Sequence, residues 1–493
     1  MTFQPTLEQQ NIVSKAIQGK NLAVMAFAGA AKTTTCTLIA QQLQKKSLYI
    51  AFNKSIAEEA KGKFPAHVEC RTLHSLAYAA IIAPQKMYKK VGGYFDTKQF
   101  LELFGDQLDY LPDYKRIESV LKVTEILRGF CQSDALNLDG YVLSHLEGEN
   151  DSYQFHLPLV TQAWAAVTSK SSNVQMTHDV YLKMFQLSNP NLEEYEVIYL
   201  DEAQDSNPVT LDIFYRQTNS QLIMVGDTYQ SIYEFRGAIN AFDTVTASNF
   251  TMMYLTESFR FTPSIATIAN TLTSIAGNTK QIIGRAESKV PKTKAILCRT
   301  NASILNYLLT ASQQGYKVHV IADLTDLWSK MYHLAALSTG SKPKYPNSEL
   351  RRFSNYGEFQ TEAENNPDLK RLLNISFLLS QGKGTHGNIV AIKEAIVEDA
   401  SKAAFSLVTA HKSKGLEWDE VELDEDMLRW DDEEGDLDEL LRELRANQTL
   451  NLLYVAVTRA KYVVRLPSKV LDILDHSNYL KSEWELPLEE VAG

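Results

Sequence analysis

This 493-residue chain lacks clustered cysteines, long apolar runs and a recognisable signal sequence. Its four cysteines show no CxxC spacing, so the sequence supports neither a zinc knuckle nor a disulfide framework. No stretch approaches the roughly 18 consecutive apolar residues that a membrane span needs. The N-terminal MTFQPTLEQQNIV has neither the basic start nor the apolar region of a signal peptide. We therefore expect a soluble cytoplasmic protein, nucleoid-associated if prokaryotic, with no membrane partner.

A net positive charge, which would attract phosphate backbones, is also missing, since the formal net charge is −11. The deficit has a local source: residues 419–440 contain thirteen Asp and Glu against Arg429 alone. That segment carries −12 and the rest of the chain +1, so a nucleic-acid partner is not excluded. Two interpretations of the acidic run stay open: a solvated loop, or an element that binds a partner or repels DNA.

Seven short apolar segments are typical of strands buried on both faces. They are residues 21–27, 47–52, 196–200, 221–225, 294–298, 317–322 and 405–409. Uninterrupted apolar strands separated by helical patterns indicate parallel sheets covered by helices. One set precedes residue 260 and the other follows it, so we predict an α/β fold with two such units.

Two blocks with helical periodicity and few strand signals interrupt these units, near residues 80–185 and 326–400. Each keeps an apolar period, so neither is a linker. The predicted first unit comprises 1–80 and 186–252 with an insertion at 81–185. The predicted second unit comprises 253–325 and 400–493 with a short insertion at 326–399.

The segment from Ala26 to Thr33 follows an apolar strand and precedes a helical pattern, where a phosphate-binding loop belongs. In such a loop backbone N–H groups cradle phosphate, a lysine reaches the terminal phosphates, and a hydroxyl holds Mg²⁺. Lys32 and Thr33 keep the GxxxxGK[ST] spacing, but alanine replaces both of its glycines and only Gly29 remains. Alone, this match is no better than an alanine-rich turn with a surface lysine.

Asp201 and Glu202 follow directly on the apolar strand at 196–200. Two adjacent carboxylates are costly to bury unless a cation or a proton accompanies them. Asp201 suits a Mg²⁺ ligand, and Glu202 suits the base that activates an attacking water. A solvated strand end is the plain alternative, but the preceding Lys-Thr loop and the following strand end at 226–230 disfavour it. Gln230 would orient water or sense the γ-phosphate of a bound nucleotide.

Eight further segments follow one another in a fixed order from residue 6 to residue 461. They are TLEQQ (6–10), AFNKSIAEEA (51–60), TLHS (72–75), DEAQD (201–205), VGDTYQSIYEFRGA (225–238), LTESFR (255–260), VTAHKSKGLEWDEV (408–421) and LLYVAVTRAK (452–461). This series resembles the motifs of UvrD/Rep-type superfamily-one helicases. AFAGAAKTTT (26–35), RTNAS (299–303) and NLLYVAVTRAK (451–461) look closest to the helicase part of F-box DNA helicases, although no F-box segment is apparent. The resemblance implies two RecA-like lobes, 1A and 2A, with helical insertions 1B and 2B.

The resemblance implies a bound ATP and assigns residues to it. Gln9 would hydrogen-bond the adenine edge, Phe259 would stack on the adenine face, and Glu417 would lie near the ribose. The loop residues at the phosphates would be Gly29, Ala30, Ala31, Lys32, Thr33 and Thr34. Ala31 takes the place of a glycine, so a methyl group must fit there, and we expect it at the helical φ that alanine is allowed. Hydrolysis should survive with weaker nucleotide affinity, while Thr34 replaces an arginine of several relatives and loosens adenine selectivity.

The resemblance also assigns the chemistry. Thr33 and Asp201 would hold Mg²⁺, and Glu202 would polarise water. Contacts with the γ-phosphate would come from Gln230, Arg260 and Arg459, the last acting as an arginine finger from the second lobe. Taken singly, Arg260 or Arg459 is usually better explained by a surface salt bridge, and the motif context reverses that preference. ATP held between the lobes would favour their closure, and hydrolysis would release it.

Residues expected on a nucleic-acid strand combine aromatic rings with cations, because stacking contributes roughly 1–3 kcal/mol per base. Phe235 beside Arg236 is the strongest pair. By resemblance, the other positions that touch a strand are Phe52, Asn53, His74 and His411. Without the motifs, a lone histidine or phenylalanine is more often a core or surface residue.

The function these features favour is an ATP-dependent DNA helicase or translocase moving 3′ to 5′ on single-stranded DNA and at single-strand/duplex junctions; the direction rests on the resemblance alone. One alternative is a translocase that hardly unwinds, since the second insertion is short. Another is an ATP-switch subunit of a DNA repair or anti-phage defence assembly. That assembly would need a partner nuclease, because no nuclease constellation is visible in the sequence.

Overall fold

The computed structural model describes residues 4–148, 150–234, 237–246, 249–344, 346–347, 349–428, 437–446 and 448–484. The chain divides into two compact units. The first contains Met1–Phe27 and Ala31–Leu255, and the second contains Ala28–Ala30 and Thr256–Gly493. Each unit is described by itself below.

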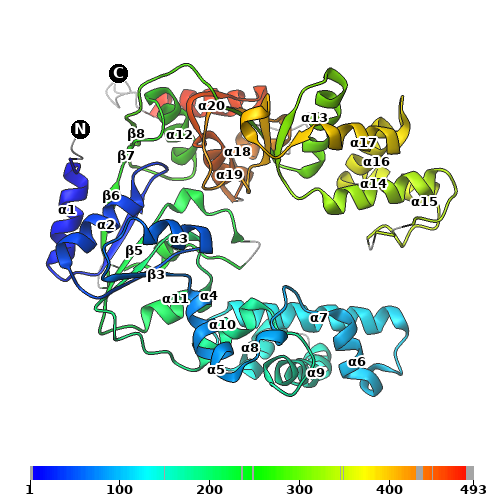
Figure 1. The fold of residues 1–493 in the computed structure, drawn as a ribbon, viewed down its shortest axis with the longest axis horizontal. Coiled ribbons are helices and arrows are strands. Elements are labelled where there is room, and N and C mark those ends of the chain that lie inside the picture. The colour runs from blue at the N-terminus through cyan, green and yellow to red at the C-terminus, as the bar shows by residue number, and fades with distance from the viewer. Residues whose placement is uncertain are drawn as a thin grey trace, which may run out of the picture. The chain divides into compact units, whose positions relative to one another are not determined.

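The first unit is built on a six-stranded parallel sheet with the strand order β3-β2-β4-β5-β1-β6. Its strands are β1 (Leu22–Ala26), β2 (Ser47–Ile50), β3 (Val68–Arg71), β4 (Val197–Leu200), β5 (Gln221–Gly226) and β6 (Thr251–Leu255). Helices α1 (Leu7–Ile17), α2 (Lys32–Leu43), α3 (Lys54–Lys61) and α11 (Pro208–Tyr215) belong with this sheet (Figure 1). Because β2 and β4 are buried along their whole length, their sequences read as continuous apolar runs.

Helices fill the chain between β3 and β4 (Figure 1). They are α4 (Leu73–Ala77), α5 (Ala83–Gln85), α6 (Thr97–Leu108), α7 (Asp113–Gln132), α8 (Leu138–His145), α9 (Asn150–Thr168) and α10 (His178–Leu187), with a π-helical turn at Tyr78–Ile82.

Two lysines are buried in this helical part. The Lys90 ammonium donates to the carbonyls of Ala166, Ser172 and Val174 at 2.9, 3.0 and 2.6 Å. Lys183 donates to the carbonyls of Ser133 and Ala135, so both charges tie loops to helices.

The second unit carries another six-stranded parallel sheet, with the order β11-β10-β12-β9-β13-β14. Its strands are β9 (Lys294–Cys298), β10 (Val318–Ile321), β11 (Ile396–Val397), β12 (Phe405–Thr409), β13 (Trp418–Leu423) and β14 (Ala460–Arg465), and a separate pair joins β7 (Glu257–Ser258) to β8 (Ile283–Gly284). The helices near the sheet are α12 (Pro263–Ile275), α13 (Asn301–Gln314), α18 (Leu437–Ala446), α19 (Thr449–Val457) and α20 (Ser468–Trp484). The helices between β10 and β11 are α14 (Thr325–Ser338), α15 (Tyr356–Asn365), α16 (Pro367–Ser380) and α17 (Gly384–Ala395).

The predicted α/β class with parallel sheets is confirmed, and all seven apolar segments form strands. The remaining strands of the two sheets carry polar residues or are short. In β3 the burial alternates between buried Val68 and exposed Glu69, so its pattern is weak. Within the described residues, no helix has both the length and the apolar character to cross a membrane.

The acidic run begins as a strand, which corrects the interpretation as a loop for residues 419–423; the interpretation as an element that binds a partner or repels DNA stays a prediction. In β13, Asp419 accepts the backbone N–H groups of Lys292 and Thr293 at 2.9 and 3.2 Å. Glu420 pairs with Arg465 at 2.8 Å, and Glu422 with Lys294 at 2.7 Å. Sheet geometry and neighbouring cations therefore account for this part, while residues 429–436 lie outside the described residues.

Candidate active site

The predicted phosphate loop connects β1 to α2, as the sequence indicates. Gly29 has φ +75°, and a Cβ there would lie 2.5 Å from Ser258 Oγ and 2.6 Å from Arg260 Cβ. The Gly29 carbonyl accepts the Phe259 N–H at 3.0 Å, and the Ala28 N–H donates to Tyr454 Oη at 3.1 Å. Because of these contacts, Ala28–Ala30 belong to the second unit. The close approach of Ser258 and Arg260, together with the positive φ, means that only glycine, which has no Cβ, fits at position 29.

Ala31, the residue before α2, does not have the right-handed helical φ that the sequence predicts. It lies in the left-handed region, at φ 58° and ψ 43°. Its carbonyl accepts the Thr35 N–H at 3.0 Å and the Thr35 hydroxyl at 3.1 Å, which fixes the first turn of the helix. The loop must reverse here before the helix begins, so the chain keeps a conformation that costs an alanine about 1–2 kcal/mol.

Lys32 opens α2, and its ammonium lies 2.6 Å from Glu202 Oε1, which follows β4. The two side chains are only 15% and 17% exposed. Burial opposes the charge on Lys32, but the carboxylates of Glu202 and Asp201 outweigh it and raise the lysine pKa. Glu202 is itself in the left-handed region at φ 50°. The structure therefore brings the loop lysine and the predicted base into direct contact.

Asp201 lies beside this pair and is 5% exposed. Burial raises its pKa, the Glu202 charge adds to that, and Lys32 lowers it. The Tyr49 hydroxyl, on the adjacent strand β2, donates to Asp201 Oδ2, and Oδ1 accepts the Glu202 N–H at 3.0 Å. A buried carboxylate held this way is a defined oxygen ligand at a strand end.

The donor set fits Mg²⁺ bound together with a nucleotide. Mg²⁺ is usually held by one or two carboxylates, while waters and phosphate oxygens complete its octahedron. Asp201 offers such a carboxylate, and Thr33 lies in the first turn of α2 beside Lys32. Among the described residues no group of three or more His, Cys, Asp and Glu could hold a metal ion unaided. Thr34 also lies in this first turn.

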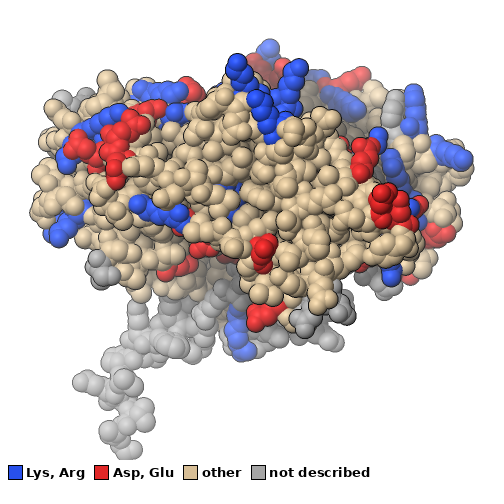
Figure 2. Space-filling view, turned by 90° about the horizontal axis from the view of Figure 1, so that it is seen from below, with Lys and Arg blue, Asp and Glu red and all other residues tan. Residues whose placement is uncertain are grey.

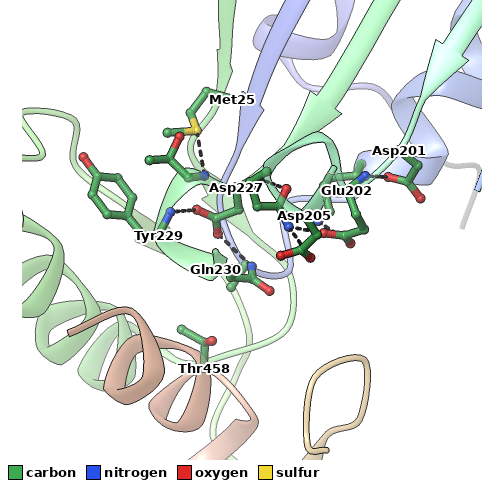
Figure 3. Close-up of polar contacts among 12 residues, drawn as sticks. Met25, Asp201, Glu202, Asp205, Asp227, Tyr229, Gln230 and Thr458 are labelled. Carbon is green, nitrogen blue, oxygen red and sulfur yellow. Dashed lines mark hydrogen bonds and ion pairs between the residues drawn. The ribbon is translucent and has the colours of Figure 1, made fainter. Parts of the chain in front are cut away.

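A hydrogen-bonded network extends from Glu202 to the end of β5 (Figure 3). Asp227 accepts the Gln230 side-chain amide at 2.7 Å and the Tyr229 N–H at 3.1 Å. Gln204 donates to Glu202 Oε2 at 2.6 Å and accepts the Asp227 N–H at 2.9 Å. The predicted sensor Gln230 is thus linked to the predicted base through Asp227 and Gln204.

In the second unit, Glu417 lies between two cations. Its carboxylate is 3.0 Å from Arg260 Nε and 2.7 Å from Lys461 Nζ. Burial would raise the Glu417 pKa, but Lys461 and Arg260 outweigh it and hold the pKa below its usual value. Arg260 also donates to the Thr458 carbonyl at 3.2 Å. The predicted ribose contact is therefore a counter-ion for the predicted γ-phosphate contact.

Arg459 is 1% exposed. Its guanidinium donates to the carbonyl of Val455 at 2.8 Å and to that of Leu416 at 3.4 Å. These backbone acceptors belong to its own unit, and its role as an arginine finger stays a prediction.

The two predicted adenine contacts differ in exposure. Gln9 is buried: its amide accepts the Thr6 N–H and donates to Thr35 Oγ1, both at 3.0 Å. Phe259 is 48% exposed.

A cavity of about 610 Å³ in the first unit brings together several residues expected on a strand. Phe52 and His74 line it, with Asp201 and Asp205. Tyr233 also lines it, and its ring stacks on that of Phe52 with centroids 5.8 Å apart and planes 15° apart. On the face shown in Figure 2, Lys and Arg occur in small groups among broad uncharged areas.

The other predicted strand residues have separate positions. Asn53 caps α3, where its side chain accepts the Ile56 N–H at 2.9 Å. His411 lies two residues beyond β12 in the second unit. Phe235 and Arg236 lie outside the described residues, so their pairing stays a prediction.

Sequence reasoning missed Tyr49, Gln204 and Lys461. Gln204 and Lys461 stand inside the quoted motifs DEAQD and LLYVAVTRAK, so motif membership was an available signal. The sequence gives no signal for Tyr49, because its contact with Asp201 depends on the pairing of β2 with β4, which a single sequence does not reveal.

Residues 9–236 match a family model described as an AAA domain. The chain is 29% identical to F-box DNA helicase 1 of Gallus gallus, over 92% of this chain and 48% of that protein. It is 30% identical to F-box DNA helicase protein 1 of Schizosaccharomyces pombe, over 92% and 56%. A probable DNA helicase II homolog of Mycoplasma genitalium is 25% identical over 53% of this chain and 42% of that protein. The chain thus spans about half the length of the curated relatives it matches, and its resemblance to superfamily-one helicases is confirmed.

Proposed function

We propose that this relative of the UvrD/Rep-type superfamily-one helicases couples Mg-ATP hydrolysis to 3′–5′ movement on single-stranded DNA and to duplex unwinding. The observation that carries the proposal is the ion pair between Lys32 and Glu202, at 2.6 Å beside buried Asp201. A lysine in the loop after β1, with a base and a metal-binding carboxylate after β4, are the parts that phosphoryl transfer to water requires. The two F-box relatives are named as DNA helicases, which supports DNA as the polymer.

The ion pair also defines how hydrolysis begins. A nucleotide's terminal phosphates would attract Lys32 away from Glu202, since phosphate oxygens carry more negative charge than one carboxylate. Once the Lys32 charge has moved, Glu202 loses its counter-ion and its proton affinity rises. The carboxylate is then suited to accept a proton from the attacking water. Substrate binding itself would thereby activate the base.

Asp201 and Thr33 would hold Mg²⁺, which supplies charge neutralisation at the phosphate oxygens. Tyr49 keeps the Asp201 carboxylate oriented by donating to one of its oxygens. In the second unit, Arg260 and Lys461 share Glu417, and a phosphate group would compete with that carboxylate for the same cations. We assign Arg260 and Arg459 to the γ-phosphate, because a planar guanidinium matches phosphoryl oxygens.

The cavity lined by Phe52 and Tyr233 is the proposed strand site, because bases of any sequence stack on aromatic faces. The 3′–5′ direction follows the family and is tested separately from hydrolysis.

The test measures the ATPase rate with single- and double-stranded DNA and RNA at one stated salt concentration. We expect single-stranded DNA to raise the rate roughly tenfold or more, a typical size for coupling between two sites. Strand displacement with 3′-tailed, 5′-tailed and blunt duplexes then reports direction. No hydrolysis in the presence of single-stranded DNA would overturn the proposal. Hydrolysis without displacement would leave the translocase alternative, and co-purification of a nuclease would favour the switch subunit.

A further inference from the structure

Gln204 lies at the centre of the polar network between the base and the loop after β5. Its side chain is fully buried, at 0% exposure. The amide nitrogen donates to Glu202 Oε2 at 2.6 Å and to Asp205 Oδ2 at 3.1 Å. The amide oxygen accepts the Asp227 N–H at 2.9 Å, and the backbone carbonyl accepts the Ser231 hydroxyl at 3.2 Å. One residue therefore joins Glu202 to both ends of the 227–231 loop.

This connection has little freedom. A Cβ on Gly226 would lie 2.2 Å from Gln204 Oε1 and 3.0 Å from the Ala203 nitrogen. The end of β5 therefore packs directly on the Gln204 amide, and the two loops cannot shift independently without breaking hydrogen bonds that are buried. Leaving a buried amide unpaired costs about 1–3 kcal/mol, so movement of one loop is transmitted to the other.

The same loop leads to the strand cavity. Tyr233 follows Ser231 by two residues and stacks on Phe52, and both rings line the cavity of about 610 Å³. Asp205, which accepts from Gln204, and Asp201 line the same cavity. Gln204 thus lies between the carboxylate proposed to activate water and the aromatic pair proposed to stack on a strand.

We propose that Gln204 is a positioning residue that couples occupancy of this cavity to the orientation of Glu202. A base inserted against Tyr233 displaces the 227–231 loop, and the Gln204 amide carries that displacement to Glu202 Oε2. The carboxylate then turns away from Lys32 toward the position of the attacking water. The inference rests on the proposed function and adds the route by which a strand stimulates hydrolysis.

The test replaces Gln204 by methionine, which keeps the volume and removes all three side-chain hydrogen bonds. The matched control is Gln217→Met in the same unit. Gln217 is also buried, at 4% exposure, and its amide accepts the Leu192 N–H and donates to the carbonyls of Pro190 and Ile213. Both variants lose an equivalent set of buried hydrogen bonds, but Gln217 has no link to Glu202 or to the loop.

Two ratios are measured in the full chain. The first is the ATPase rate with saturating single-stranded DNA divided by the rate without it. The second is the affinity for a fluorescent oligonucleotide with a non-hydrolysable ATP analogue divided by the affinity without it, which needs no turnover and reports the coupling of the two sites in binding. In Gln204→Met we expect both ratios to fall about tenfold or to approach one, while Gln217→Met keeps the wild-type ratios.

Gln204→Met with wild-type ratios would overturn the inference, and so would an equal loss in both variants. If the methionine variant does not fold, Gln204→Glu is used, since it keeps the shape and the acceptor for Asp227 but replaces the donors by a carboxylate. Failure of the proposed function is distinguishable, because wild-type protein would then show no stimulation by a strand at all.

Discussion

The two α/β units share a six-stranded parallel sheet but hold their charged groups differently. In the first, the side chains of Lys32 and Glu202 are 15% and 17% exposed, and Glu202 is tied to the Gln204 amide; in the second, Arg260 is 18% exposed and its partner Glu417, which also pairs with Lys461, is 42% exposed. The units also differ in backbone strain: among the described residues, five non-glycine residues have positive φ, and all five, including Ala31 and Glu202, lie in the first unit. The described part of the second unit has none.

This difference indicates a division of tasks. Strained backbone persists where the surroundings over-determine it, which suits groups that must be held in one geometry during a reaction. The Glu417 carboxylate is 42% exposed, although Arg260 is only 18% exposed, so solvent partly screens these ion pairs and each contributes about 0–1 kcal/mol. On the proposed function, the first unit would fix reacting groups, while the ion pairs of Glu417 in the second unit would change partners; Arg459, which is 1% exposed, is held by the backbone of the second unit.

The strongest test of this comparison is Lys32→Ala. We expect turnover to fall by roughly a thousandfold or more, because the variant loses the phosphate contact and leaves Glu202 buried without its cation. Strand binding should change little. Steady-state ATPase rates and oligonucleotide anisotropy measure the two effects. Lys46→Ala, which removes an exposed ion pair with Glu194 in the same unit, is the control and should retain turnover. Retained turnover in Lys32→Ala would remove the basis for the proposed site.

Backbone strain in the first unit is tested by Ala31→Gly. Glycine adopts positive φ freely but gains entropy in the unfolded chain, so the net gain in unfolding free energy should be about 0.5–1 kcal/mol. Nucleotide affinity should rise as well. The control Gln44→Gly relieves a similar φ of 50° at the end of α2 and should affect stability alone. Thermal unfolding and KM for ATP are the measurements, and a loss of stability in Ala31→Gly would contradict the assigned conformation.

Exchange of partners in the second unit is tested by Glu417→Gln. Removing the carboxylate frees Arg260 and Lys461 for phosphate, and KM for ATP should fall about two- to fivefold, the size of an exposed ion pair. A matched variant is Glu257→Gln, whose residue pairs with Arg285 in the same unit and should leave KM unchanged. A higher KM in Glu417→Gln would instead support the ribose contact implied by the family.

The smallest expected effect is a pH dependence. Because the pKa of Glu417 is held below its usual 4.5, the pair stabilises the fold above that pH and is lost as the pH falls through the lowered value. The difference in unfolding free energy between wild type and Glu417→Gln, measured by denaturant unfolding, should therefore be constant from pH 7 to about 5 and shrink below about 4.5, by less than about 1 kcal/mol. A difference that grows on acidification would reverse the assigned sign.

Periodicity and motif order predicted the α/β class and seven strands, because buried parallel strands have continuous apolar sequences. They missed β13, whose Asp419, Glu420 and Glu422 read as an acidic run until their partners Lys294 and Arg465 were known. The left-handed φ of Ala31 was unpredictable for a similar reason, since alanine rarely takes it without tertiary constraint. The motifs predict which residues approach a nucleotide, but the links made by Tyr49 and Gln204 depend on neighbours that are distant in sequence.

The chemical reactivity of the two buried lysines can report how often the helices between β3 and β4 separate. The residues Lys90 and Lys183 are 8% and 0% exposed, and the amine of each donates hydrogen bonds to carbonyl oxygens. An amine-acylating reagent should therefore modify surface lysines at once and reach these two only when the helices separate. Mass spectrometry of their peptides over time would then report how often this part of the protein opens, with and without a bound oligonucleotide.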